Sequence, residues 1–186
     1  GKLFIIEHDK KFFEFQKEHF EGNSKIEVIH ADALKCDWPI VNKIISNVPY
    51  QISGPLFAKI AKSEFEKGVF MVQKEFADRL TAQSNTNNYG RLSVIYSLLF
   101  EVKILKQVSN AVFFPKPKVQ STIISVEPKK LEPDKQSKIK ANLDSLFYFL
   151  QIIFPYKNKI LRRAILESIK AIDDKDYKIK LEKLLE

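Results

Sequence analysis

The residues best suited to chemistry stand in one short turn, Asn47-Val48-Pro49-Tyr50. An Asn side-chain oxygen and a backbone carbonyl are both hydrogen-bond acceptors, so Asn47 and Pro49 can together hold an amino group. Proline fixes its own φ and stiffens the turn, and Tyr50 offers an aromatic face for stacking a nucleobase. An exocyclic amine held by two acceptors has its lone pair drawn out of conjugation with the ring. The turn therefore predicts recognition and alkylation of a planar amine, and the alternative is an ordinary turn before a helix.

Three apolar runs, each followed by a polar residue, predict the parallel strands that position this turn. Residues 3–6 run into Glu7, residues 26–30 are followed closely by Asp32, and residues 43–45 lead to Asn47. Continuous apolar runs are typical of buried parallel strands, and open α/β sheets bind ligands at the carboxyl ends of their strands. We therefore expect the three polar residues to lie in register along one sheet edge. Taken singly, each has the alternative of being a solvated side chain.

The remaining pattern predicts an α/β domain over residues 1–128, followed by a linker and a small helical subdomain over residues 129–186. After residue 128 the composition becomes polar and charged through residue 140, which indicates a linker. Apolar periodicity and turn residues predict the other elements. These are helices at 10–20, 54–62, 74–81, 91–100, 143–154, 158–169 and 177–185, strands at 68–73, 102–108 and 122–126, and a polar loop at 84–90.

Composition limits the function classes. The chain of 186 residues, 45% hydrophobic, has no apolar run long enough for a membrane span and no signal peptide, so we expect a soluble, cytoplasmic protein. One cysteine excludes an intrachain disulfide, and the three histidines have no metal-ligand spacing, so no metal is expected. The net charge of +8 arises almost entirely from residues 101–186. That asymmetry favours a nucleic-acid partner, and the alternative is a set of solvated lysine-rich faces.

A second unusual segment, residues 113–119, reads Phe-Phe-Pro-Lys-Pro-Lys-Val. Two prolines exclude a helix interior or a central strand. Phe113 next to Lys116 and Lys118 suits base stacking combined with phosphate contact. The alternative is a proline-rich connector whose aromatic side chains fill the core.

Together these motifs resemble the ribosomal RNA adenine dimethyltransferases of the KsgA type, most closely the archaeal form. Six segments carry the resemblance, in the family's order and over essentially the whole chain. They are Ile6-Glu7-His8-Asp9, Asp32-Ala33-Leu34, the Asn47 to Ser53 segment, residues 73–79, residues 89–93 and residues 113–121. The resemblance implies a Rossmann-like class I S-adenosylmethionine-dependent methyltransferase fold with a C-terminal all-helical subdomain.

The resemblance also implies residue roles. Glu7 would bind the ribose of S-adenosylmethionine and Asp32 its adenine, with His8, Ala33 and Asn47 in the same cofactor site. Asn47 and the Pro49 carbonyl would hold the target amine, while Tyr50 and Phe113 would sandwich the target base. Basic residues would bind rRNA phosphates: Lys116, Lys118, Lys157, Lys159, Arg162 and Arg163. The reaction would be two methyl transfers to the exocyclic amine of adenosines in a single-stranded loop of small-subunit rRNA.

One family feature is not found in these residues, namely a first strand followed by a Gly-rich cofactor loop. The five glycines never cluster, and Ala31 stands where the family usually has Gly. In this fold the first strand lies between the strands that end at Glu7 and Asn47, and leaving out a central strand exposes two apolar edges. We therefore expect a second polypeptide to supply that strand and loop, with a truncated chain as the plainer alternative. Two other functions remain open: a non-catalytic RNA-binding assembly or transcription factor on the same scaffold, and a DNA adenine methyltransferase.

Overall fold

The strands of the computed structural model form two separate sheets, and the model describes residues 1–170, 172 and 174–182. Its strands are β1 (Leu3–Glu7), β2 (Ile26–His30), β3 (Lys43–Asn47), β4 (Lys67–Gln73), β5 (Phe100–Val108) and β6 (Ser121–Pro128). Its α-helices are α1 (Lys10–His19), α2 (Ser53–Lys62), α3 (Lys74–Leu80), α4 (Arg91–Leu99), α5 (Pro133–Ala141), α6 (Leu143–Ile153), α7 (Leu161–Lys170) and α8 (Lys175–Glu182). Short 3-10 turns η1 (Tyr50–Ile52), η2 (Asn110–Val112) and η3 (Phe154–Tyr156) complete the described elements.

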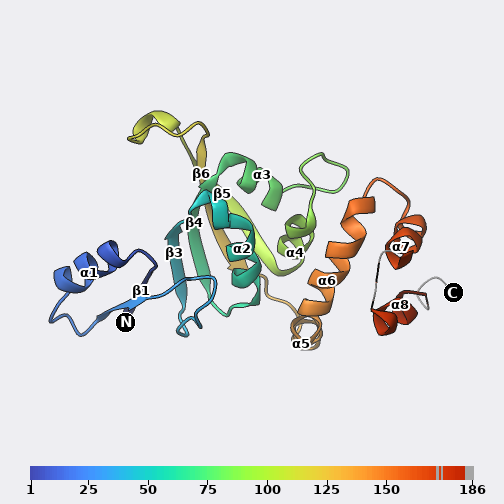
Figure 1. Ribbon diagram of the computed structural model, residues 1–186, viewed down its shortest axis with the longest axis horizontal. Coiled ribbons are helices and arrows are strands. Elements are labelled where there is room, and N and C mark those ends of the chain that lie inside the picture. Colours follow the sequence, from blue (N-terminus) through green and yellow to red (C-terminus); the bar gives the residue numbers. More distant parts are fainter. Residues whose placement is uncertain (171, 173, 183–186) are drawn as a thin grey trace.

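The first sheet pairs β1 with β2 in parallel, and the second has the order β3-β4-β6-β5. In the second sheet β3 and β4 are parallel, and β6 runs antiparallel to both of its neighbours. The β1–β2 sheet lies beyond the β3 edge of the larger sheet (Figure 1). Among the described residues no strand joins the two sheets, so β1 and β3 are both edge strands.

This arrangement corrects the expectation that residues 3–6 and 43–45 form buried strands. Leu3 is 53% exposed and Ile45 is 83% exposed. The sequence has the apolar pattern of strands covered on both faces, but the structure gives each strand a single neighbour. The apolar residues of a strand without a second neighbour or a covering helix remain in contact with solvent.

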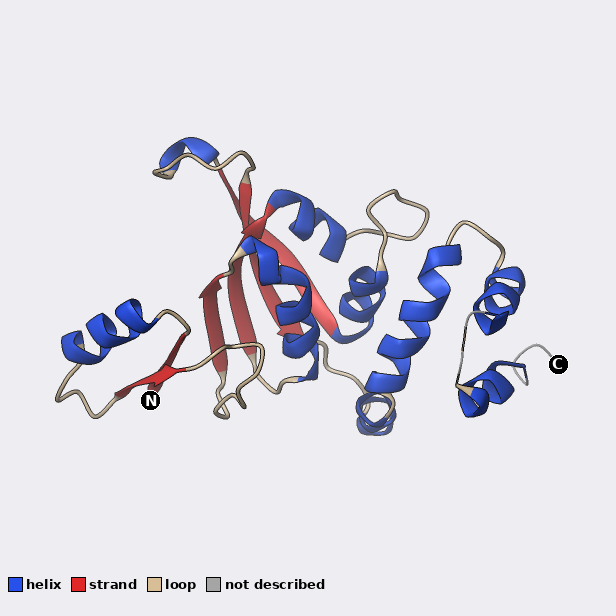
Figure 2. Cartoon of the chain, viewed as in Figure 1, coloured by secondary structure: helices blue, strands red, loops and turns tan. Residues whose placement is uncertain are grey.

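The core lies between the larger sheet and the helices α2 and α4 (Figure 2). Apolar residues recur in α2 at the spacing that places them on one helical face, and Phe57 and Ile60 are fully buried. The Phe57 ring lies 5.1 Å from that of Phe70 in β4 and 4.9 Å from that of Phe76 in α3, measured between centroids. These edge-to-face contacts fix α2, and with it the turn that precedes α2, against the sheet.

Helices α5 to α8 follow β6, and this region differs in two details from the expectation. Helix α5 occupies most of the segment expected to be a linker, with Pro133 in its first turn, where the missing N–H costs nothing. The helix expected from residue 158 begins at Leu161. The last expected helix corresponds to α8, although its end at residues 183–185 lies outside the described residues.

Ion pairs join this helical part to the end of α2. Lys62 pairs with Asp144 of α6, and Lys140 of α5 lies 2.6 Å from the Glu64 carboxylate. The Lys140 ammonium lowers the pKa of Glu64, mainly through this hydrogen bond. The division at residue 128 into two domains remains a prediction. Within the described residues, the structure contains no helix with the length and apolar character needed to cross a membrane.

Candidate functional site

The polar residues expected at strand ends do lie at the carboxyl ends of parallel strands. Glu7 is the last residue of β1 and Asn47 the last of β3, while Asp32 follows β2 by two positions. They do not lie along one continuous edge, however, because β1 and β2 belong to a different sheet from β3. The expectation of a single edge is therefore wrong for the residues that the structure describes.

Both acids are oriented by local backbone contacts. Oε1 of Glu7 accepts a hydrogen bond of 2.7 Å from the Asp9 N–H, and Oδ1 of Asp32 accepts one of 2.9 Å from the Leu34 N–H. The second oxygen of Asp32 has only a long contact, 3.8 Å to the Lys35 ammonium. Each carboxylate is thus held through one oxygen, and the other oxygen can accept from a ligand hydroxyl or amine.

The two neighbours expected in the cofactor site differ in their surroundings. His8 is exposed, and its carbonyl lies 3.2 Å from the His30 Nε2. Ala33 packs against the core cluster, and its carbonyl accepts a hydrogen bond of 2.8 Å from the Trp38 indole. Trp38 also packs against the core cluster, so the segment after β2, which includes Asp32, is held against the core of the larger sheet.

The turn after β3 is anchored at Val48, which is 1% exposed and donates from its N–H to the Met71 carbonyl at 3.0 Å. Asn47 is exposed on the opposite side of the strand. The Pro49 carbonyl accepts from the Ile52 N–H at 3.1 Å and has a long contact of 3.5 Å with the Ser53 hydroxyl. The acceptors of the turn are thus at the surface, on a backbone that Val48 holds in place.

Tyr50 is held in place by a contact of its hydroxyl group. Its hydroxyl lies 2.7 Å from the hydroxyl of Ser121, the fully buried first residue of β6. The Tyr50 ring is half-buried and lines a cleft of about 690 Å³. A hydroxyl fixed by Ser121 and a side chain that lines the cleft suit an aromatic platform for a planar ligand.

The 109–120 segment joins β5 to β6 and rises from the same end of the sheet as the turn after β3. The strand register shows this, because Asn47 pairs with Met71 and Gln73 pairs with Ser121. The Asn110 side chain donates to the Pro117 carbonyl at 3.2 Å and braces the segment. The segment projects past the sheet (Figure 1), with Phe113 half-buried and Phe114, Lys116 and Lys118 exposed.

The cleft beside Tyr50, which we call the Tyr50 cleft, draws on several elements that the sequence reasoning did not join. Its lining residues come from η1 and the start of α2, from β4 and α3, from the loop and first turn of α4, and from η3. They are Tyr50, Ser53, Gly54, Gln73, Glu75, Phe76, Arg79, Asn87, Asn88, Tyr89, Gly90, Arg91, Leu92, Phe154 and Lys157. The sequence indicates this cleft only through two segments that resemble the family, residues 73–79 and 89–93, because both contribute to its lining.

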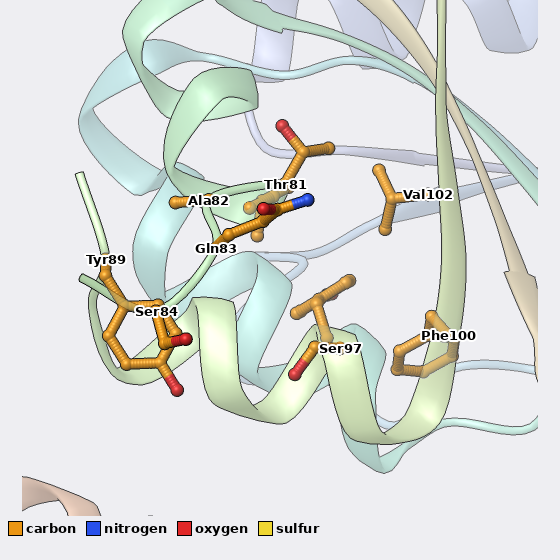
Figure 3. A pocket seen from close by; sticks show the side chains of 10 residues that line it. Thr81, Ala82, Gln83, Ser84, Tyr89, Ser97, Phe100 and Val102 are labelled. Atoms are coloured by element: carbon orange, nitrogen blue, oxygen red, sulfur yellow. The ribbon is translucent and has the colours of Figure 1, made fainter. Parts of the chain in front are cut away.

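A second cavity, of about 480 Å³, lies beside the 81–90 loop (Figure 3). It is lined by that loop, by α4 and by the start of β5, and Tyr89 lines both cavities. None of its lining residues is charged. Tyr89 therefore borders both a cleft with charged lining residues and a cavity without them.

The four residues of the helical part that were expected to bind RNA have three different surroundings. Lys157 lines the Tyr50 cleft, and its ammonium donates to the Tyr89 carbonyl at 3.1 Å. Lys159 instead lies 3.5 Å from the Glu167 carboxylate, and Lys159, followed by Lys170, lowers the pKa of Glu167. The remaining two, Arg162 and Arg163, are exposed in the first turn of α7. In the described part of the chain, no group of three His, Cys, Asp or Glu residues is placed to hold a metal ion.

Comparison with known proteins first defines the class. The structure of a dimethyladenosine transferase from Plasmodium falciparum superposes with a TM-score of 0.76 at 33% identity, covering 88% of this chain and 59% of that one. The 23S rRNA methyltransferase ErmE superposes with a TM-score of 0.63 at 24% identity, covering 89% of this chain and 66% of that one, and shares the fold. The fold is that of the Rossmann-like methyltransferases, as the sequence predicted.

The family follows from sequence. The model of the family "Ribosomal RNA adenine dimethylase" matches residues 2–183, and the chain belongs to this family. It is similar to the "Probable ribosomal RNA small subunit methyltransferase A" of Pyrococcus abyssi, 38% identical over 177 residues, 95% of this chain and 62% of that protein. The protein of the same name from Methanosphaera stadtmanae is 36% identical over 184 residues, 97% of this chain and 65% of that protein. The chain thus spans about three-fifths of the length of the curated relatives that it matches.

Proposed function

We propose that the chain takes part in S-adenosylmethionine-dependent dimethylation of the exocyclic amine of adenosines in small-subunit rRNA. The observation that carries this proposal is the turn after β3, in which Asn47 is exposed, Val48 is anchored and Tyr50 is held by Ser121. Family membership and the similarity to small-subunit rRNA methyltransferases support the substrate class.

The turn is suited to activate an amine. Asn47 Oδ1 accepts one hydrogen of the amine, and the Pro49 carbonyl accepts the other. A carbonyl oxygen has two lone pairs, one of which already accepts from the Ile52 N–H at 3.1 Å. The long 3.5 Å contact with the Ser53 hydroxyl is the one that the target amine displaces. In the first transfer both hydrogens are held, so the nitrogen lone pair points away from the ring plane and can attack the methyl group that S-adenosylmethionine would supply, leaving S-adenosylhomocysteine and releasing one amine proton. In the second transfer the single remaining N–H is held.

The acids after β1 and β2 fit the polar groups of a nucleoside cofactor. Glu7 and Asp32 each keep an oxygen that is not used by the local backbone contact. Glu7 accepts from ribose hydroxyls, and Asp32 accepts from the adenine amine. When bound, S-adenosylmethionine supplies an electrophilic methyl group. The protein contributes orientation of the amine and exclusion of water, the usual sources of rate in a reaction of this kind.

The aromatic and basic residues complete the substrate side. Phe113, on the segment between β5 and β6, stacks on the second face of the base that Tyr50 holds. Phosphates are held by Lys116 and Lys118 on that segment and by the basic residues around α7. This set of residues favours RNA methylation over a purely scaffolding RNA-binding role, because a scaffold needs neither an exposed Asn47 nor the two strand-end acids.

The unpaired edges carry a further part of the proposal, namely that a parallel strand followed by a Gly-rich loop inserts between β1 and β3. Among the described residues both strands have a free edge, and apolar side chains on them are exposed: Ile45 of β3 at 83% and Leu3 of β1 at 53%. Calorimetric titration of the purified chain with S-adenosylmethionine tests this. Tight binding by residues 1–186 alone contradicts the insertion of such a strand. Binding that appears only when a polypeptide carrying the strand and its Gly-rich loop is added supports the insertion.

The central experiment is Asn47→Ala. Mass spectrometry of rRNA incubated with S-adenosylmethionine, the protein and a polypeptide that carries the inserted strand should show that the substitution abolishes methyl transfer while RNA binding is retained. Asn42→Ala is the matched control, because Asn42 precedes β3 at its opposite end and bonds the Glu66 carboxylate at the surface. Methyl transfer that survives Asn47→Ala would show that Asn47 does not hold the amine.

A further inference from the structure

The Tyr50 cleft is far larger than one aromatic platform requires. Its volume is about 690 Å³, within the range of about 300–1,000 Å³ typical of ligand sites. Tyr50 occupies one part of the lining, and the rest comes from α3, the start of α4 and the residues around η3. A base stacked on Tyr50 therefore has, directly beside it, a polar space that the proposed chemistry does not use.

The charge in this space suits an anion. Three cations line it, Arg79, Arg91 and Lys157, against one carboxylate, Glu75. Arg79 pairs with Glu75 at 3.1 Å. Among the described residues Arg91 has no carboxylate partner, and the ammonium of Lys157 contacts only the Tyr89 carbonyl. Two cations on separate elements are thus free to share a phosphate.

The cleft also presents a second aromatic surface. The Tyr89 ring is half-buried, and its centroid lies 6.0 Å from that of Phe154 at an interplanar angle of 39°. Phe154 supports Tyr89 from η3, and Lys157 secures the Tyr89 backbone from the same turn. An aromatic side chain braced in this way is a stacking platform with little conformational freedom left to lose.

The walls are fixed by one buried residue. Ser93, which is fully buried, donates from its hydroxyl to the Arg79 carbonyl at 2.6 Å and accepts from the Gly90 N–H at 2.9 Å. These two bonds tie the end of α3 to the start of α4, so Arg79 and Arg91 keep a constant separation. The neighbouring 480 Å³ cavity has no charged lining residue, so it offers no electrostatic attraction to a polyanion.

We propose that the Tyr50 cleft binds the nucleotide adjacent to the target adenosine in a single-stranded RNA, with its phosphate between Arg91 and Lys157 and its base against Tyr89. This inference rests on the proposed function, because it takes the base on Tyr50 to be the target. It adds a subsite that makes the enzyme select unpaired RNA, since only an extended strand places two successive bases on Tyr50 and Tyr89.

The test measures binding of a fluorescein-labelled single-stranded hexaribonucleotide by anisotropy at several salt concentrations. For single strands each phosphate contact contributes about 0.7 to the slope of log K against log salt. Arg91→Gln and Lys157→Gln together should therefore reduce the slope by about 0.7, because both cations hold the same phosphate, and should weaken binding at low salt. Tyr89→Leu should weaken binding without changing the slope. Lys103→Gln is the matched control, because Lys103 lies on β5 and pairs with Glu101 outside the cleft.

An unchanged slope in the double variant overturns the inference, as does a wild-type chain that does not bind the hexamer. Because Arg91 and Lys157 are exposed, the variants keep the fold, and circular dichroism checks this. The proposed function is measured separately, by methylation of adenosine in rRNA. Methylation with an unchanged slope refutes only the subsite, whereas a reduced slope without methylation refutes the proposed function and leaves an RNA-binding cleft.

Discussion

Gly68→Ala is the substitution whose effect the structure defines most closely. Gly68 is buried in β4, and a Cβ built on it lies 2.3 Å from Cε2 and 2.6 Å from Cζ of Phe70, two residues along the same strand. Carbon atoms in contact stand about 3.5–4.0 Å apart, so the ring has to move by more than 1 Å on this estimate. The ring has nowhere to move, because Phe70 is fully buried and packs edge-on against Phe57.

The magnitude follows from two opposing effects. Overpacking a core of this kind costs about 1–3 kcal/mol, and replacing glycine by alanine in a strand returns about 0.5–1 kcal/mol. The difference spans about 0–2.5 kcal/mol and is centred on about 1 kcal/mol, which for a chain of this size lowers the melting temperature by about 2–4 °C. Thermal unfolding followed by circular dichroism measures it, and Phe70→Leu in the Gly68→Ala background should recover part of the loss.

Gly54→Ala is the matched control. A Cβ at Gly54 meets no atom within 4 Å, and the residue lies in the first turn of α2. Alanine there should leave the melting temperature unchanged or raise it, by up to about 1 kcal/mol of stability. If Gly68→Ala were as stable as the wild type, the reasoning about a rigid aromatic layer would be refuted.

Three further predictions concern single contacts. Ser121→Ala and Tyr50→Phe should each lower kcat/KM for methyl transfer by about 2- to 10-fold, because each removes one hydrogen bond worth about 0.5–1.5 kcal/mol. The double variant should lose no more activity than either single variant. Additive losses would show that the two hydroxyls act separately. Tyr96→Phe should lower the free energy of unfolding in urea by about 1 kcal/mol, because its buried hydroxyl donates to the Phe57 carbonyl at 2.8 Å, and an unchanged midpoint would contradict this. The pKa of Glu64 is lowered by Lys140, so the pair stabilises the fold above pH 4.5 and is lost as the pH falls through the lowered pKa; Glu64→Gln should flatten the acid limb of melting temperature against pH, and an unaltered limb would exclude the pair as a contributor.

Secondary structure was largely predictable because its signals are local. The runs at residues 26–30 and 68–73 became β2 and most of β4, since apolar periodicity and flanking turn residues fix such elements without long-range information. The pairing of β6 antiparallel to β4 was not predicted, because register between distant strands depends on tertiary packing. The exposure of Ile45 was also missed, since a sequence pattern shows which residues suit burial and cannot show what covers them.

The candidate site was predictable only in part, for a similar reason. The turn at Asn47 to Tyr50 is contiguous, so its chemistry is visible in the sequence. The bond between Tyr50 and Ser121 joins residues 71 positions apart, and the Tyr50 cleft gathers residues from 50 to 157. No spacing rule links such residues, and only the folded chain brings them together.

The two hydrogen bonds of the Ser93 hydroxyl have a consequence for how this region can change over evolutionary time. Because one buried hydroxyl fastens residues 79 and 90, the segment between them is a closed loop whose ends are pinned independently of its length. Doubling a flexible loop costs only about 0.6 kcal/mol in closure entropy. Insertions or deletions among residues 84–88 therefore leave the positions of Arg79 and Arg91 unchanged. The loop can acquire new contacts in evolution while the two arginines keep their place.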